Sequence, residues 1–130
     1  MRHSILTENA VKSIDNSFAT LSGIDELAAM LGVTKCHLIR TFTADTGASP
    51  GKRLVARRIS AAILILCHRD YSIETVANMV GYSGANYFCK AFRHIVGESP
   101  GAFRQGQAAH PPLSFGDRQL LEKLDKLAHT

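Results

Sequence analysis

The sequence predicts an all-α protein with two helix-turn-helix subdomains joined by a long linker helix. Apolar residues recur at helical spacing along most of the 130 residues. A helix, a glycine corner and a second helix occur twice along the chain. An apolar content of 45% is ordinary for a globular chain. We therefore expect residues 1–106 to form the helical body, and residues 107–130 to form a C-terminal loop and a short amphipathic helix.

The chain is expected to open with a helix over about residues 7–20, which packs as a support. Thr7 can cap the start of this helix, and Glu8 complements the helix dipole in its first turn. No residue in this stretch suggests a catalytic role. Its apolar stripe consists of Ala10, Val11, Ile14 and Phe18.

The first unit is predicted over about residues 24–47, and the linker helix over about residues 49–68. The second helix of the first unit begins at Thr34, which can cap it. Ser49 and Pro50 begin the linker helix, because proline is well tolerated in the first turn of a helix. At ~1.5 Å per residue the linker helix has a length of about 30 Å.

The second unit is predicted over about residues 72–97. Ser72 can cap its first helix, and Gly81 ends that helix because glycine adopts a left-handed conformation without a steric penalty. Ser83 can cap the second helix, and Gly97 stops it. The apolar face of this second helix carries Phe88 and Phe92.

The two units are copies of one pattern. A shift of 49 residues superimposes the first helices, and a shift of 50 residues superimposes the second helices, because the later copy contains one additional residue. The matched pairs are Ile24 and Ile73, Ala28 and Ala77, Met30 and Met79, Gly32 and Gly81, Leu38 and Phe88, Arg40 and Lys90, Phe42 and Phe92, and Gly47 and Gly97.

The second copy and its flank resemble the DNA-binding domain of the AraC/XylS family of bacterial transcription regulators. The resemblance extends from about Val11 to Arg104 and implies a homeodomain-like fold of the AraC type. It also implies binding to double-stranded DNA, with RNA polymerase as a partner in activation. The residues that carry it are Ala77, Gly81-Tyr82, Tyr87-Phe88, Lys90, Phe92, Gly97, Pro100 and Phe103-Arg104.

In the first unit the resemblance places the recognition helix at Thr34 and beyond. Arg40 is the strongest candidate for base contact, because a guanidinium can donate two parallel hydrogen bonds to guanine. An ion pair with Asp45, or a phosphate contact alone, remains the alternative. His37 is expected to pack or to lie near phosphates. The expected DNA-facing residues are Thr34, Lys35, Cys36, His37, Ile39 and Arg40.

Basic residues near the start of the linker helix are candidates for phosphate contact. Arg58 matches a family position that holds the fold together. A linker of this length could present two recognition helices to successive major grooves, and DNA bending would cost about 1–6 kcal/mol. The expected phosphate contacts are Lys52, Arg53 and Arg57.

In the second unit we expect more backbone anchoring than base contact, because two small residues begin the recognition helix. Asn86 can contact adenine, and Lys90 can reach guanine or a phosphate. Tyr87 and Phe88 are expected to be largely structural. The expected DNA-facing residues are Ser83, Gly84, Ala85, Asn86, Cys89 and Lys90.

Charge and composition narrow the function classes. Between residues 34 and 104 there are ten Lys or Arg against four Asp or Glu, so the positive excess lies in the body expected to meet DNA. Three cysteines without paired spacing indicate neither a zinc finger nor a disulfide framework. No targeting or membrane-spanning segment is evident. We expect a cytoplasmic protein without cofactor, metal, small-molecule ligand or enzymatic activity.

Several alternatives stay open. The fold could serve as a protein-interaction module, which would suit the apolar Cys36 and Ile39. A DNA-repair enzyme with a reactive cysteine would use the same fold. The chain could be a short stand-alone regulator or a fragment of a larger effector-responsive one. The amphipathic helix after residue 107 could fold back on the domain or bind a partner.

Overall fold

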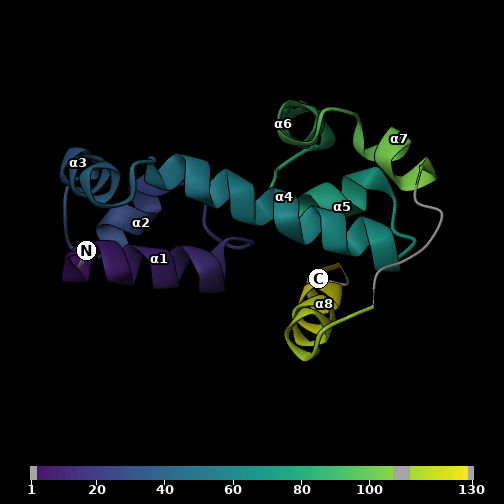
Figure 1. Ribbon diagram of the computed structural model, residues 1–130, viewed down its shortest axis with the longest axis horizontal. Coiled ribbons are helices and arrows are strands. Elements are labelled where there is room, and N and C mark those ends of the chain that lie inside the picture. Colours follow the sequence, from purple (N-terminus) through teal and green to yellow (C-terminus); the bar gives the residue numbers. More distant parts are fainter. Residues whose placement is uncertain (1–2, 107–111, 129–130) are drawn as a thin grey trace. The chain divides into compact units, whose positions relative to one another are not determined.

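The computed structural model describes residues 3–106 and 112–128, and within these ranges it contains eight α-helices and no strand (Figure 1). The predicted all-α class is confirmed. The chain divides into two compact units, residues 1–57 and 58–130, with the boundary inside the long helix α4 (Pro50–His68). The predicted C-terminal loop begins on residues 107–111, which lie outside the described residues.

The first unit is built on three helices and the start of α4. Helix α1 packs on α3 and also contacts α2 (Figure 1). The helices are α1 (Ile5–Ser17), α2 (Ile24–Met30) and α3 (Lys35–Thr46). Their core consists of Ala10, Ile14, Phe18, Leu21, Leu27, Ala28, Leu38 and Phe42, all at most 3% exposed.

The start of α1 differs from the prediction. Ser4 precedes the helix, and its Oγ accepts a hydrogen bond from the Thr7 backbone N–H at 3.2 Å. The Thr7 side chain is instead buried, and its hydroxyl donates to Asp45 of α3 at 2.6 Å. Asp45 also accepts from the Ser4 N–H at 3.0 Å and from the Ser4 hydroxyl at 2.9 Å. Thr7 therefore docks α1 on α3 and does not cap α1.

Glycines with positive φ close both helix-turn-helix corners, as the repeat predicts. Gly32 has φ 72° and Gly81 has φ 108°, a region that other residues enter only with strain. In each corner the residue after the glycine donates its N–H to a carbonyl five residues earlier. Gly47 and Gly97, with φ 83° and 99°, end the second helices in the same way.

The second unit contains the rest of α4 and four further helices. Their bounds are α5 (Ile73–Met79), α6 (Ala85–Val96), α7 (Pro100–Gln105) and α8 (Phe115–Ala128). Ser72 caps α5 as predicted, because its side chain accepts from the Thr75 N–H. Gly84, and not Ser83, is the N-cap residue of α6, so no side chain caps this helix. Gly84 therefore matches Thr34, and the exposed Ser83 is the additional residue of the second copy.

A chain of aromatic contacts holds the second unit together. Successive ring centroids of Tyr82, Phe88, Phe92 and Phe103 lie 5.7 Å apart in each pair, at tilted angles. Phe88 and Phe92 are fully buried. This chain ties α6 to the corner before it and to α7 after it.

Arg58 lies inside the second unit, in the fold-holding role expected for it. Its side chain is buried, and its guanidinium carbon lies 5.2 Å from the centroid of the Tyr82 ring. Burial lowers the pKa of Arg58 and raises the pKa of Tyr82, where the neighbouring guanidinium charge opposes the rise.

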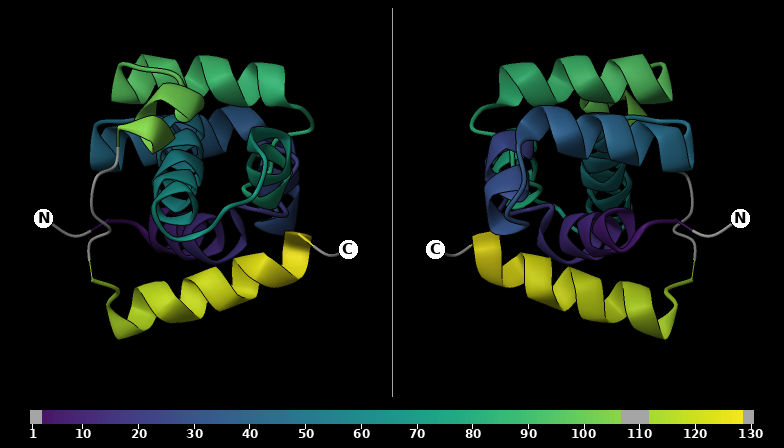
Figure 2. Two further views of the ribbon diagram at one scale, coloured as in Figure 1. Left: turned by 90° about the vertical axis from the view of Figure 1, so that its right-hand side faces the viewer. Right: turned by 90° about the vertical axis from the view of Figure 1, so that its left-hand side faces the viewer.

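Helix α8 folds back on the second unit, which settles an alternative left open by the sequence. It packs on α5 and buries Leu121 and Leu124 completely. In Figures 1 and 2, α6 and α8 lie on opposite sides of α5.

The Asp45 contacts predict an acid-sensitive first unit. Hydrogen bonds from Thr7 and Ser4 hold the pKa of Asp45 below its ordinary value. Its contribution to the free energy of unfolding is therefore present above the pKa of the unfolded chain, and it is lost as the pH falls below about 4. We expect Asp45→Asn to lower the melting temperature at pH 7 and to flatten its decline in acid. Thermal melts from pH 7 to 2.5, with the exposed Asp117→Asn as charge-matched control, test this; identical acid profiles for both variants would contradict it.

Candidate nucleic-acid interface

Helix α3 buries one face and leaves the opposite face in solvent. Leu38 and Phe42, one helical turn apart, are at most 1% exposed. Thr34 caps the helix, because its Oγ1 accepts the His37 N–H at 3.1 Å. The residues expected to face DNA are all exposed: Thr34, Lys35, Cys36, His37, Ile39 and Arg40.

Lys35 and Arg40 are the two basic side chains on this face, and they differ in whether they form an ion pair. Lys35 forms an ion pair with Asp25 of α2 at 3.4 Å, and both side chains are more than half exposed, so the pair contributes little to stability. The alternative pairing of Arg40 with Asp45 is not observed, because Asp45 accepts hydrogen bonds from Ser4 and Thr7. Among the described residues no ion pair engages Arg40, so its guanidinium is available to a ligand.

The basic cluster at the start of α4 is partly neutralised inside the first unit. Arg53 donates three hydrogen bonds to the Asp15 carboxylate of α1, at 2.8, 3.1 and 3.3 Å. Arg57 lies 3.4 Å from the same carboxylate, and its guanidinium carbon lies 5.3 Å from the centroid of the Phe18 ring. Of the three predicted phosphate contacts, Lys52 is the one that the structure leaves exposed, whereas Arg53 and Arg57 also fasten α4 to α1.

Helix α6 repeats the division of faces seen in α3. Phe88 and Phe92 are buried, whereas Ser83, Asn86 and Lys90 are exposed and Gly84, Ala85 and Cys89 are half-buried. Asn86 and Lys90 are one helical turn apart on the outward face, as Cys36 and Arg40 are on α3.

Tyr87 is a surface residue, which corrects the prediction that it is largely structural. Its side chain is 69% exposed, while its neighbour Phe88 is fully buried. The internal repeat contained the signal, because Tyr87 occupies the position of His37 in the first copy, which was expected to face DNA. Tyr87 therefore joins the outward face of α6, where its hydroxyl can hydrogen-bond to a phosphate.

A small basic hollow lies beside this face. Cys89, Lys90, Arg93 and Ser99 line a cavity of about 170 Å³ between α6 and the start of α7. Two cationic side chains and a hydroxyl group suit a phosphate oxygen. The outward face of α6 thus combines an amide that can pair with a base edge and cations that can pair with the backbone.

Other chemistries find less support in the described part of the chain. Residues 3–106 and 112–128 contain no cluster of three or more His, Cys, Asp or Glu side chains that could hold a metal ion. Cys36 is exposed, Cys89 half-buried and Cys67 buried. Burial raises the pKa of Cys67, which makes it a poor nucleophile. None of the helices described is both long and apolar enough to cross a membrane.

Comparison with known proteins connects this geometry to a family. The family model described as "Helix-turn-helix domain" matches residues 27–106. The HTH-type transcriptional regulator RipA of Corynebacterium glutamicum is 36% identical over 99 residues, which cover 72% of this chain and 30% of RipA. The chain therefore spans less than a third of the length of that relative.

Two solved structures share the fold. The C-terminal domain of AraT, a response regulator from Geobacillus stearothermophilus, is 26% identical with a TM-score of 0.78, covering 88% of this chain and 96% of that domain. The DNA-binding domain of AdpA, a global transcriptional factor solved in complex with a target DNA, is also 26% identical, with a TM-score of 0.72 and coverage of 78% and 92%.

The contrast between Tyr87 and Phe88 gives a test of the outward face. We expect Tyr87→Ala to change the free energy of unfolding by less than about 0.5 kcal/mol, because the side chain is exposed. We expect it to weaken DNA binding about tenfold. Phe88→Ala should instead cost about 3–5 kcal/mol of stability, because it empties a core position. Urea unfolding and fluorescence anisotropy with a duplex measure both quantities; unchanged DNA affinity in Tyr87→Ala would remove this residue from the interface.

Proposed function

The chain belongs to the AraC/XylS family of helix-turn-helix DNA-binding transcription regulators, and from this premise we propose that it places two recognition helices, α3 and α6, in successive major grooves of one duplex. The equivalence of their outward faces carries the proposal. In both helices the apolar pair one turn apart is buried, and polar side chains occupy the opposite face. Two such faces from one chain suit a two-part DNA site.

Base contact is assigned to two side chains. Arg40 is exposed and has no ion-pair partner among the described residues, so its guanidinium can donate to guanine N7 and O6. Asn86 is exposed on α6, and its amide can pair with adenine N6 and N7. Each pairing distinguishes the right base from a wrong one by about 1–3 kcal/mol. Cys36 and Ile39 offer apolar contact to thymine methyl groups.

Phosphate contact is assigned to the cations that remain in solvent. Lys52 at the start of α4, and Lys90 and Arg93 beside the hollow on α6, are exposed. Arg53 and Arg57 contribute less, because the Asp15 carboxylate already binds them. Each phosphate contact releases counterions, so DNA affinity should fall steeply as salt rises.

Membership of the family supports a proposal for the biological role. We propose that the protein activates transcription in the cytoplasm and that RNA polymerase is its partner. The proposal includes no enzymatic step.

Selection of bound duplexes from a random library tests the proposal. We expect the wild-type chain to enrich a site of two parts, with centres about one helical turn apart. Arg40→Ala should relax one part and Asn86→Ala the other, each with about a tenfold loss of affinity for the selected site. A Lys52→Ala variant provides the control, since losing a phosphate contact should weaken all sequences alike and reduce the salt dependence.

Two kinds of result would contradict the proposed function. Enrichment of a single part, or of none, would rule out two-part binding by this chain alone. Binding to a protein partner that does not change with salt, without DNA enrichment, would favour the interaction-module alternative.

A further inference from the structure

Helix α8 lies beyond the family pattern and is nevertheless part of the second unit. The matching family model ends at residue 106, whereas α8 begins at Phe115. Leu121 and Leu124 of α8 are at most 1% exposed, and they are buried by packing on α5. Since α6 and α8 lie on opposite sides of α5, α8 cannot act by sharing the outward face of α6 (Figure 2).

Because α2 and α5 are equivalent helices of the internal repeat, α2 can be compared with α5 to see what the packing of α8 changes. Met30 on α2 and Met79 on α5 occupy equivalent positions in the two copies. Met30 is 57% exposed, whereas Met79 is fully buried. In the first unit α1 packs mainly on α3, whereas in the second unit α8 packs on α5. The second copy therefore buries a helix face that the first copy leaves in solvent.

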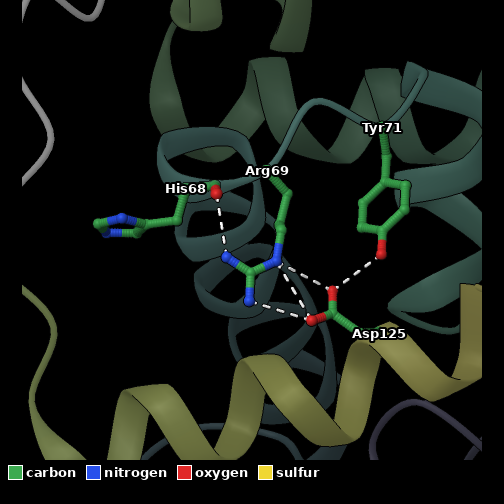
Figure 3. A network of polar contacts seen from close by, with 4 residues as sticks. All are labelled: His68, Arg69, Tyr71 and Asp125. Carbon is green, nitrogen blue, oxygen red and sulfur yellow. Dashed lines mark hydrogen bonds and ion pairs between the residues drawn. The ribbon is translucent and has the colours of Figure 1, made fainter.

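A polar network fixes α8 at the corner between α4 and α5 (Figure 3). The Asp125 carboxylate accepts from Arg69 Nε at 3.2 Å, from Arg69 Nη2 at 3.0 Å and from the Tyr71 hydroxyl at 2.9 Å. Arg69 Nη1 also donates to the carbonyl of His68, the last residue of α4, at 3.1 Å. One carboxylate thus holds the end of α4 and the segment that leads into α5.

The contact between Arg69 and Asp125 fixes a defined geometry. A guanidinium that donates through two nitrogens to one carboxylate fixes both distance and orientation. The Asp125 contact raises the pKa of Arg69, and the hydrogen bond to Asp125 also raises the pKa of the Tyr71 hydroxyl. Arg69 is occupied by Asp125, so it is not one of the cations facing DNA.

We propose that Asp125 is a positioning residue for DNA binding: through Arg69 and Tyr71 it docks α8 on α5 and so sets the orientation of the recognition helix α6. This inference rests on the proposed function. Helix α5 carries α6 through the Gly81 corner and the Tyr82 and Phe88 rings, so movement of α5 displaces α6. The first recognition helix, α3, is supported by α1 and does not depend on this network.

Asp125→Asn tests the inference in the full chain. The variant removes the carboxylate charge and places amide hydrogens against the Arg69 donors. We expect amide hydrogen exchange to accelerate about tenfold in α5 and α6 and to stay unchanged in α1, α2 and α3. We expect affinity to fall about tenfold for the half-site that depends on Asn86, and to stay within twofold for the half-site that depends on Arg40.

Two further variants separate positioning from charge. Asp117→Asn makes the same charge change at an exposed position of α8. The loss of one negative charge by itself should strengthen DNA binding slightly. Tyr71→Phe removes one hydrogen bond without a change of charge, and it should cause a smaller loss in the same direction as Asp125→Asn. A merely structural effect would slow or speed exchange throughout the chain and would weaken both half-sites alike.

The outcomes separate this inference from the proposed function. If the wild-type chain selects no DNA, the proposed function fails, and the exchange data alone decide whether Asp125 holds α5. If Asp125→Asn behaves like Asp117→Asn in exchange or at the second half-site, the positioning role is overturned.

Discussion

Each recognition helix depends on one apolar pair spaced by a helical turn. Leu38 and Phe42 anchor α3, and Phe88 and Phe92 anchor α6, with all four side chains buried. Burying such side chains contributes about 1.5–3 kcal/mol each, which is far more than exposed ion pairs contribute. Because i and i+4 lie on the same side of a helix, this burial turns the opposite side, which carries Arg40 on α3 and Lys90 on α6, toward solvent. The packing of the core thus determines which side chains can meet DNA.

In each unit an additional helix packs against the helix-turn-helix pair, but the two additional helices contact different members of that pair. In the first unit α1 docks on α3, with Asp45 as the acceptor for Thr7 and Ser4. In the second unit α8 docks on α5, with Asp125 as the acceptor for Arg69 and Tyr71. Both devices place a carboxylate against several donors, an arrangement that fixes geometry as well as supplying energy.

Internal contacts also occupy several of the basic residues that the composition suggested for DNA binding. Arg53 and Arg57 bind Asp15, Arg69 binds Asp125, and Arg58 is buried over Tyr82. These arginines stabilise the two units. Fewer cations therefore remain exposed on the outward faces of α3 and α6.

The sequence by itself determined the helix order, the glycine corners and the buried pairs, because these follow from local spacing and from an internal repeat. It also contained the outward position of Tyr87, through its equivalence to His37, although Tyr87 was expected to be largely structural. Only the tertiary structure decided that Thr7 binds Asp45, that Arg53 binds Asp15 and that α8 covers α5. The partners in the first two pairs are 38 residues apart, and Arg69 and Asp125 are 56 apart. Such pairings depend on how helices pack in space, which local periodicity does not specify.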